Sequence, residues 1–143
     1  MDSKIFFYEF GKMIYKIDRF YAEYAKRFDV KANLLWILYA LNDLKVHSQK
    51  EVCETWDLPR STVNTIMKEL ESNGYVELKK IKGEKRELEV QLTKKGVDYS
   101  SKLLSELYEI EKKTYDNLSN IDVIKKMNEV LDGLNKNLEE NYD

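Results

Sequence analysis

Apolar residues recur every three or four positions along most of the chain, and this spacing places them on one face of an α-helix. The first run covers residues 5–28 and predicts a long amphipathic helix. After a break at residues 29–31, a denser apolar run at 34–41 predicts a second, more buried helix. Runs at 103–115 and 121–138 predict long helices in the last third of the chain. The chain is therefore predicted to be mainly helical, and its few turn formers, 5 Gly and 1 Pro, agree.

A pair of short helices is predicted in the middle of the chain, because start and stop signals follow one another closely. Ser48 and Glu51 stand three residues apart as in a capping box, which opens a short helix that ends near Glu54. Pro59 suits the first turn of the next helix, and Gly74 suits its left-handed C-terminal end. Two short helices joined by a tight turn form a helix-turn-helix candidate.

The second of these helices has two chemically different faces. At about 100° per residue, four apolar side chains fall within about 100° of arc: Val63, Ile66, Met67 and Leu70. The opposite face carries small hydrogen-bonding residues and one cation: Ser61, Asn64, Thr65 and Lys68. Such side chains can approach base edges and phosphates in a DNA major groove. An ordinary solvated helix face has the same composition, so this pattern alone leaves both interpretations open.

Two segments after this helix, at 75–78 and 87–92, alternate between apolar and polar residues and predict a β-hairpin. Basic residues surround the expected turn at Gly83: Lys79, Lys80, Lys82, Lys85 and Arg86. A basic hairpin tip can reach phosphates or a minor groove, whereas a charged strand edge can also serve only to discourage aggregation. The position of the hairpin directly after the polar-faced helix favours a role in DNA binding.

The distribution of charge agrees with that role, although the whole chain has a net charge of −2. Residues 60–95 contain 9 Lys and Arg against 6 Asp and Glu, which is a net charge of +3. Residues 96–143 contain 6 against 11, which is a net charge of −5. Because phosphate neutralisation depends on local charge, the basic excess in the helix and hairpin matters more than the sum.

The remaining candidate chemistry predicts a protein that is not an enzyme and uses no metal or cofactor. Cys53 is the only cysteine, which excludes an internal disulfide, fits a reducing compartment and favours a buried structural thiol over a redox sensor. His47, Glu51 and Cys53 fall short of a closed zinc shell. No nucleophile–base pair, glycine-rich phosphate loop or carboxylate pair stands in a context that supports catalysis.

The aromatic residues, which include 10 Tyr and 2 Trp, offer material for a ligand pocket. Tyr15, Trp36 and Tyr39 could line such a pocket between the long helices and the helix-turn-helix, although core packing is the more frequent role of such residues. The longest apolar run, at 34–41, is too short to cross a bilayer, and the N-terminus does not read as a signal sequence. We therefore expect a cytoplasmic protein.

The hairpin and the helix before it also carry a characteristic spacing of residues. Residues 84–96 read Glu-Lys-Arg-Glu-Leu-Glu-Val-Gln-Leu-Thr-Lys-Lys-Gly, which is acidic-x-Arg, an alternating strand and then Leu-Thr-x-x-Gly. Residues 70–76 read Leu-Glu-Ser-Asn-Gly-Tyr-Val, and Ser61-Thr62-Val63 begins the polar-faced helix. Together these segments resemble the wing, the preceding turn and the recognition helix of the MarR family. Glu84 departs from the Asp that is usual there, and its longer side chain is expected to pair with Arg86.

The resemblance implies a mainly α fold with a small β-hairpin wing, a winged helix-turn-helix with long N- and C-terminal dimerisation helices. It implies one domain over residues 1–143, with a DNA-reading module at about 30–95 and dimerisation regions at 1–28 and 97–141. The implied function is a sequence-specific transcription regulator, with repression favoured over activation. It would bind double-stranded DNA as a homodimer on a pseudo-palindromic operator, and a small-molecule effector could release it.

The resemblance also places the DNA contacts on two groups of residues. The recognition-helix group is Arg60, Ser61, Thr62, Asn64, Thr65 and Lys68, and the wing group is Lys80, Lys82, Lys85 and Arg86. By the same resemblance Arg86 is the arginine of the wing tip. The alternative is a winged-helix module that has lost DNA binding and docks a protein partner through its long helices. The acidic last third of the chain keeps that alternative open.

Overall fold

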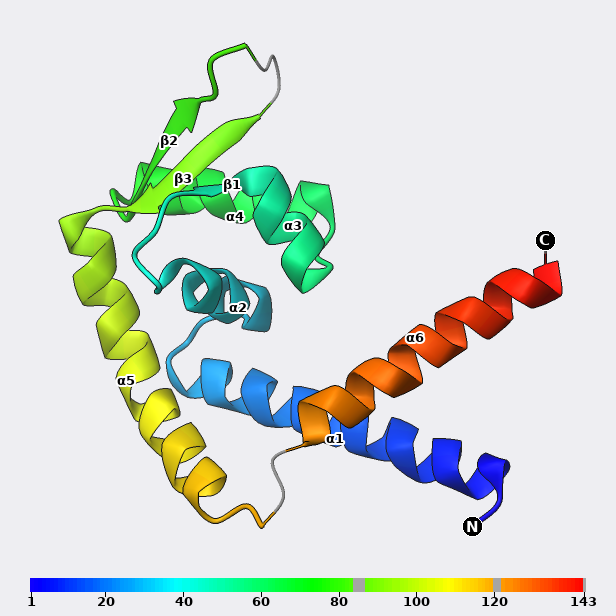
Figure 1. Ribbon diagram of the computed structural model, residues 1–143. Coiled ribbons are helices and arrows are strands. Elements are labelled where there is room, and N and C mark those ends of the chain that lie inside the picture. Colours follow the sequence, from blue (N-terminus) through cyan, green and yellow to red (C-terminus); the bar gives the residue numbers. More distant parts are fainter. Residues whose placement is uncertain (84–86, 120–121, 143) are drawn as a thin grey trace. The chain divides into compact units, whose positions relative to one another are not determined.

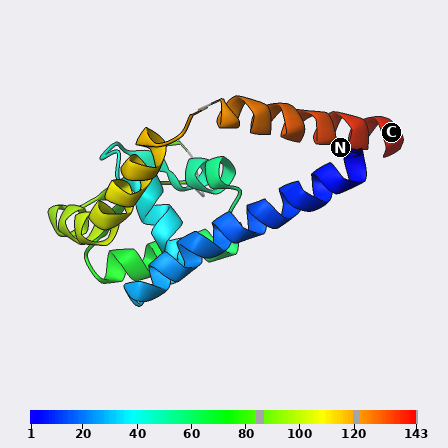
Figure 2. The same ribbon diagram turned by 90° about the horizontal axis from the view of Figure 1, so that it is seen from below.

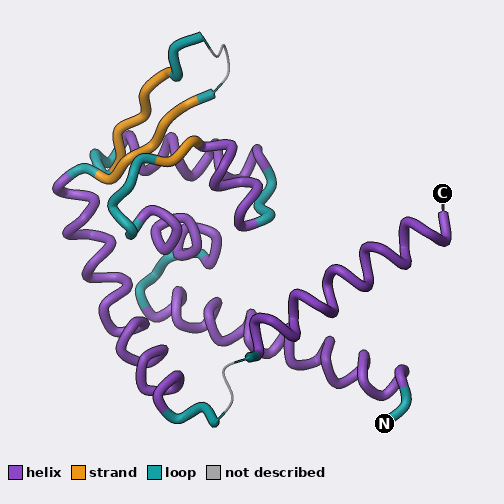
Figure 3. Tube along the Cα trace, in the orientation of Figure 1, coloured by secondary structure: helices purple, strands orange, loops and turns teal. Residues whose placement is uncertain are grey.

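The computed structural model describes residues 1–83, 87–119 and 122–142, which form six helices and three short strands (Figure 1). The elements are, in order, α1 (Ser3–Arg27), α2 (Ala32–Leu41), β1 (His47–Ser48), α3 (Gln49–Trp56), α4 (Arg60–Ser72), β2 (Val76–Lys80), β3 (Leu88–Leu92), α5 (Lys94–Asp116) and α6 (Val123–Tyr142). The prediction of a mainly helical fold with a small β-hairpin is confirmed (Figure 3). Contacts divide the chain into two compact units, Met1–Leu107 and Tyr108–Asp143.

Three antiparallel strands form one sheet in the order β1-β3-β2. β2 and β3 are the predicted hairpin, in a register that pairs Val76 with Leu92 and Leu78 with Val90. The sequence does not predict β1, because two residues are too few to show alternation. His47 of β1 pairs with Val90 on the other edge of β3. The sheet therefore ties the start of α3 to the hairpin.

The core of the first unit is built from residues of α1, α2, α4 and α5 and from the inner face of the hairpin. Its buried apolar residues include Ala25, Leu35, Ile37, Leu38, Leu41, Val63, Met67, Leu70, Val76, Val90, Leu103, Leu104 and Leu107. The predicted apolar face of α4 is confirmed, since three of its four residues are buried and Ile66 is half-buried. α1 runs as one unbroken helix (Figure 2). Tyr21 near its C-terminal end contacts Trp36 of α2.

The buried hydroxyl of Tyr24 joins α1 to α5. It donates to the carbonyl oxygen of Leu103 at 2.6 Å and accepts from the N–H of Leu107 at 3.1 Å. These two backbone groups stand four residues apart, as do the partners of one helical hydrogen bond. The tyrosine is therefore satisfied inside the core by the backbone of the helix that it packs against.

α3 ends two residues later than predicted, at Trp56 rather than near Glu54. The indole of Trp56 stacks on Trp36 of α2 with the ring centroids 5.1 Å apart, and this packing holds the last turn in helical form. Asp57 then takes a left-handed φ of 51°, and the N–H of Leu58 closes the helix end. The stacking joins two separate helices, so a local sequence pattern does not contain it.

The start of α3 confirms half of the predicted capping box. The Oγ of Ser48 accepts from the N–H of Glu51 at 2.9 Å. The Glu51 carboxylate, however, lies beside His47, with its Oε1 2.8 Å from Nδ1, and the opposite ring nitrogen lies 2.8 Å from Oδ1 of Asp43. A neutral imidazole donates from only one nitrogen, so contact with two carboxylates favours the imidazolium. Burial alone would lower the pKa of His47, but the hydrogen bonds to Asp43 and Glu51 outweigh it and raise the pKa.

We expect these contacts to make stability depend on pH. Because the folded-state pKa of His47 lies above the ordinary value of 6.5, the contribution is complete below that value and is lost as pH rises through the folded-state pKa. Replacing His47 with Gln should lower the free energy of unfolding by up to about 1 kcal/mol at about pH 6 and by less at about pH 9. Urea unfolding of both proteins measures this difference, and His47 is the only histidine in the chain. The same difference at both pH values would contradict the assignment.

The apolar faces predicted at the two ends of the chain are present, but they remain exposed. On α1, the side chains with 40% or more of their surface exposed include Ile5, Phe6, Phe7, Met13, Ile14, Ile17 and Phe20. On α6, no residue of Val123–Tyr142 is buried, and the exposed apolar side chains include Val123, Ile124, Met127, Leu131, Leu134 and Leu138. Ile121, where the predicted final run begins, lies outside the described residues. Apolar faces of this extent are unusual on a monomeric protein.

No helix in the described ranges combines the length and the apolar character that crossing a membrane requires.

Candidate nucleic-acid interface

α4 is bounded by the two residues that the sequence singles out. Pro59 precedes the helix with φ −60° and ψ 138°, where its missing N–H leaves no backbone donor without a partner. At the other end Gly74 takes a φ of +77°, and its N–H donates to the carbonyl oxygen of Glu71 at 2.9 Å. The N–H of Tyr75 donates to the carbonyl oxygen of Leu70 at 2.8 Å, which completes a Schellman motif. The left-handed φ explains the Gly, because other residues adopt it only with strain.

The polar face of α4 lies on the outside of the unit. It consists of the exposed Ser61, Thr65 and Lys68 and the half-buried Asn64, and the half-buried Thr62 lies at its border. Thr65 Oγ1 donates to the carbonyl oxygen of Ser61 at 3.0 Å, so its hydroxyl is oriented by its own helix. The Oδ1 of Asn64 lies 3.4 Å from Nε2 of Gln49 in α3, a contact that sequence reasoning missed. The helix before the turn therefore helps to orient one candidate base-reading side chain.

Arg60, the first residue of α4, is joined to the hairpin where the turn leads into β3. Its Nη2 lies 3.0 Å from Oε1 of Glu87, the residue just before β3. The arginine side chain is 70% exposed, whereas the glutamate side chain is only 17% exposed. Sequence reasoning placed Arg60 at the interface but missed Glu87, because the two residues meet only in the folded chain.

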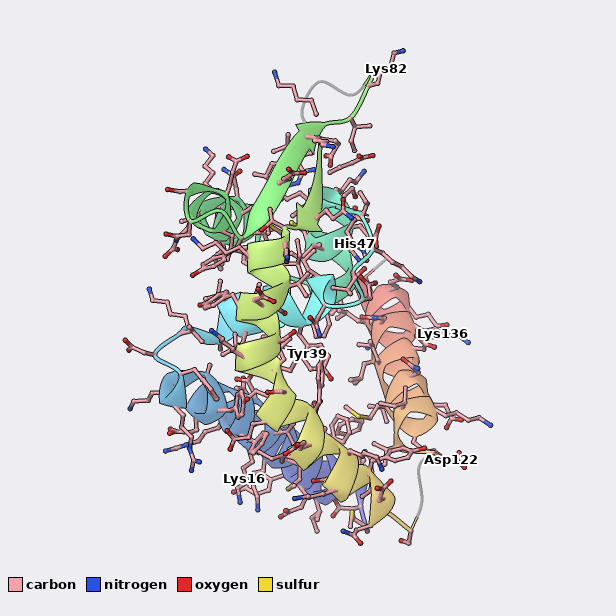
Figure 4. The ribbon with its side chains drawn as sticks, turned by 90° about the vertical axis from the view of Figure 1, so that its left-hand side faces the viewer. Lys16, Tyr39, His47, Lys82, Asp122 and Lys136 are labelled. Atoms are coloured by element: carbon pink, nitrogen blue, oxygen red, sulfur yellow. The ribbon has the colours of Figure 1, made fainter. Side chains whose placement is uncertain are left out.

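The basic hairpin is described on both sides of its tip. Lys80 at the end of β2 and Lys82 in the turn are exposed, and Figure 4 shows Lys82 at the end of the hairpin farthest from the helices. Gly83 takes a φ of +87° in that turn. Lys85, Arg86 and Glu84, the expected partner of Arg86, lie outside the described residues.

The Leu-Thr-x-x-Gly segment forms the junction between the hairpin and α5. Thr93 Oγ1 donates to the carbonyl oxygen of Gly74 at 2.6 Å and accepts from the N–H of Gly96 at 3.0 Å, as a helix cap does. Gly96 lies against the backbone of Tyr75, where an added Cβ would overlap the carbonyl oxygen. The spacing of threonine and glycine in this segment is thus explained by one close approach of two backbones.

Lys95 strengthens the same junction from the outside. Its Nζ donates to the carbonyl oxygen of Asn73 at 2.8 Å, where the C-terminal end of α4 favours a positive charge. The same ammonium lies 5.0 Å from the ring centroid of Tyr75, and that ring stacks on Tyr99 of α5 at 4.1 Å. α4, the hairpin and α5 are therefore held together as one support for the polar face.

Residues 28–87, which include α2, α3, α4 and β2, match the model of the MarR family. This segment of the chain belongs to the MarR family. Similar curated proteins include the HTH-type transcriptional regulator Hpr of Bacillus licheniformis, 31% identical over 100 residues, and the DNA-binding transcriptional repressor ScoC of Bacillus subtilis, 30% identical over 102 residues. These alignments cover 67% and 68% of this chain but 47% and 49% of the relatives, so the chain spans about half their length.

A solved structure of the MarR family supports the fold over nearly the whole chain. The regulator NMB1585 of Neisseria meningitidis has a TM-score of 0.83 with this structure and 24% sequence identity, over 93% of this chain and 96% of that one. At this identity the likeness concerns the fold. The Leu-Thr-x-x-Gly junction follows the segment that the MarR family model matches, and its hydrogen bonds give it a separate physical explanation.

The single cysteine, Cys53, lies buried in α3, within the segment that matches the MarR family. Burial raises the pKa of the Cys53 thiol, and the nearby positive charge of Arg60 offsets this only in part. A raised pKa leaves less thiolate, which is the form that oxidants attack. These properties support the structural role that the sequence favours.

The aromatic residues considered for a ligand pocket do not come together. Tyr15 on α1 is 78% exposed, whereas Trp36 and Tyr39 pack against each other and against Trp56, with centroids 5.1 to 5.8 Å apart. The structure thus favours the packing role for Trp36 and Tyr39. Within residues 1–83, 87–119 and 122–142, no cluster of three or more His, Cys, Asp or Glu side chains could hold a metal ion.

Proposed function

We propose that this chain is a sequence-specific transcription regulator that binds double-stranded DNA. The observation that supports this function best is the juxtaposition of the polar face of α4 with the basic hairpin, which Arg60 and Glu87 join. Short polar side chains on a helix can hydrogen-bond to base edges in the major groove, and exposed lysines on the hairpin can neutralise phosphates. We assign base contacts to α4 and phosphate contacts to Lys80, Lys82, Lys85 and Arg86. The name of the relative ScoC supports repression as the direction of regulation.

The regulator is proposed to act as a homodimer. The exposed apolar faces of α1 and α6 are what a second copy would cover, because burying each such side chain contributes about 1.5–3 kcal/mol. A two-fold dimer presents two reading helices, which suits half-sites about one turn of DNA apart. A pseudo-palindromic operator follows from that symmetry.

A small-molecule effector could compete with DNA in a hollow of about 660 Å³ beside α4. Its lining includes Ser61 and Thr65 from the polar face, Lys31 before α2, and Tyr99 of α5. The volume falls within the range of small-molecule sites. A bound ligand would occupy space next to two candidate DNA-contacting residues, which would release the operator.

A second candidate function is docking of a protein partner without DNA binding. The observation that favours it is the net charge of −5 over residues 96–143, which would repel a phosphate backbone. The two functions differ in one measurement, because only the first requires binding that selects a DNA sequence and weakens with salt.

Two substitutions should separate base reading from phosphate binding. Asn64→Ala should change the preferred bases in duplexes selected from a random pool, with a cost of about 1–3 kcal/mol on the wild-type site. Lys82→Ala should weaken binding to all duplexes alike and reduce the slope of log K against log salt by about 1. Fluorescence anisotropy with labelled duplexes measures both effects.

Lys16→Ala is the matched control for Lys82→Ala, because Lys16 is an exposed lysine of α1 at the opposite end of the unit in Figure 4. It should leave the salt slope as in the wild type. A wild-type protein that selects no sequence, and binds DNA upstream of its own gene no better than other DNA, would instead support the docking function.

A further inference from the structure

The contact between Arg60 and Glu87 connects the start of α4 to a fixed point of the hairpin. Besides the ion pair at 3.0 Å, the carbonyl oxygen of Glu87 accepts from the N–H of Ile81 at 3.2 Å. The glutamate is therefore anchored by its backbone at the turn end of the hairpin, just beyond the paired Lys80 and Leu88, and its side chain is largely shielded from solvent. Arg60, by contrast, extends a long side chain from the first turn of a helix. The rigid partner in this pair is Glu87.

The pair lies on the proposed reading surface. Arg60, Ser61, Asn64 and Glu87 line one groove of about 340 Å³ between α3, α4 and the hairpin. The ion pair uses one N–H of Arg60 Nη2. The second N–H of Nη2 forms an edge with a neighbouring guanidinium nitrogen, and such an edge suits bidentate hydrogen bonds to guanine or phosphate. Because Glu87 holds one nitrogen of the planar guanidinium, the remaining N–H groups of Arg60 have a defined orientation.

The negative charge of Glu87 is unexpected on a surface that faces phosphates, since an unpaired carboxylate would repel them. Its benefit to stability is small, because an ion pair with one exposed partner contributes little. Its effect on the freedom of Arg60 is larger, because a long flexible side chain otherwise loses its rotational freedom only when it binds. Ordering the side chain in advance favours the one DNA sequence that matches its orientation.

We propose that Glu87 is a positioning residue that orients Arg60 and thereby sets the base preference of the reading helix. This inference rests on the proposed DNA-binding function. Glu87 itself is not assigned a contact with DNA.

The test compares Glu87→Gln with Glu89→Gln in the full-length protein. Glu89 is an exposed glutamate of β3, two residues after Glu87, so its replacement removes the same charge from the same side of the hairpin and leaves the Arg60 contact in place. The probes are a duplex that the wild type selects from a random pool and a scrambled duplex of equal composition. The readouts are the ratio of the two affinities and the bases that each variant selects.

Glu87→Gln should lower the affinity ratio about tenfold and erase the preference at the positions that Arg60→Ala also affects. Glu89→Gln should change both affinities by the same factor and keep every preference. In an Arg60→Ala background, Glu87→Gln should have no further effect on the ratio. Thermal melting identifies any variant that is merely unfolded, and Glu87→Asp, which restores the carboxylate, should recover part of the ratio.

An affinity ratio for Glu87→Gln equal to that of Glu89→Gln would overturn the inference. So would a loss of preference spread evenly over the site, or an effect that persists without Arg60. These results would leave the proposed function intact, since the wild type would still select a sequence. A wild type that selects none would overturn the proposed function and this inference together.

Discussion

Gly96→Ala is expected to lower the melting temperature by roughly 10 °C, from a destabilisation of about 3 kcal/mol. An added Cβ would come within 2.8 Å of the Tyr75 carbonyl carbon and closer still to its oxygen. That oxygen also accepts from the N–H of Thr93 at 3.0 Å. The backbone at Tyr75 therefore has little room to retreat without breaking the junction that supports α4.

Gly133→Ala is the matched control, because Gly133 is also helical and an added Cβ there meets nothing within 4 Å. It should leave the melting temperature unchanged or raise it, since Ala favours a helix over Gly by about 1 kcal/mol. Thermal unfolding followed by circular dichroism measures all three proteins. A Gly96→Ala protein that melts with the wild type would show that the two backbones are not in close contact.

Leu131→Glu should convert the proposed dimer into a monomer and reduce operator affinity by about a hundredfold or more. Leu131 is a 55% exposed apolar residue in the middle of the apolar face of α6. In a dimer that face becomes buried, and a carboxylate there would lose its hydration without gaining a partner. A monomer binds one half-site and loses the gain in effective concentration that a second linked reading helix provides.

Light scattering after size exclusion measures the change, with the wild type expected at twice the 17.0 kDa mass of one chain. Asn128→Glu adds the same charge to the same helix but off the apolar face, and should remain dimeric. Ile17→Glu on the exposed face of α1 provides an independent test of the second surface. A wild type that is monomeric at every concentration would exclude the dimer.

Much of the fold is predictable from the sequence because it depends on residues that are close in the chain. The buried face of α4 follows from the spacing of Val63, Met67 and Leu70, and its end follows from Gly74. The cap at Thr93 is equally local. In each case one helical turn brings the relevant atoms together whatever the rest of the protein does.

The features that the sequence did not predict depend on residues that are far apart in the chain. β1 forms only because β3 offers an edge, and α3 extends to Trp56 because Trp36 is there to stack on. The Glu51 carboxylate contacts His47 instead of capping α3, and His47 lies on the strand that the sequence pattern does not reveal. These contacts join elements whose separation in space is fixed by the core, so local periodicity carries no information about them.

For the candidate site, the sequence by itself determined which residue types are exposed on α4 and on the hairpin, because amphipathic spacing reports which side faces the core. It also determined the basic excess at 60–95 and the apolar faces of the terminal helices. Only the tertiary structure decided that Arg60 is paired with Glu87 and that Asn64 lies beside Gln49. The physical reason is that a side chain's chemistry and its face of a helix are local properties. The partner of that side chain depends on how separate elements of the fold pack together.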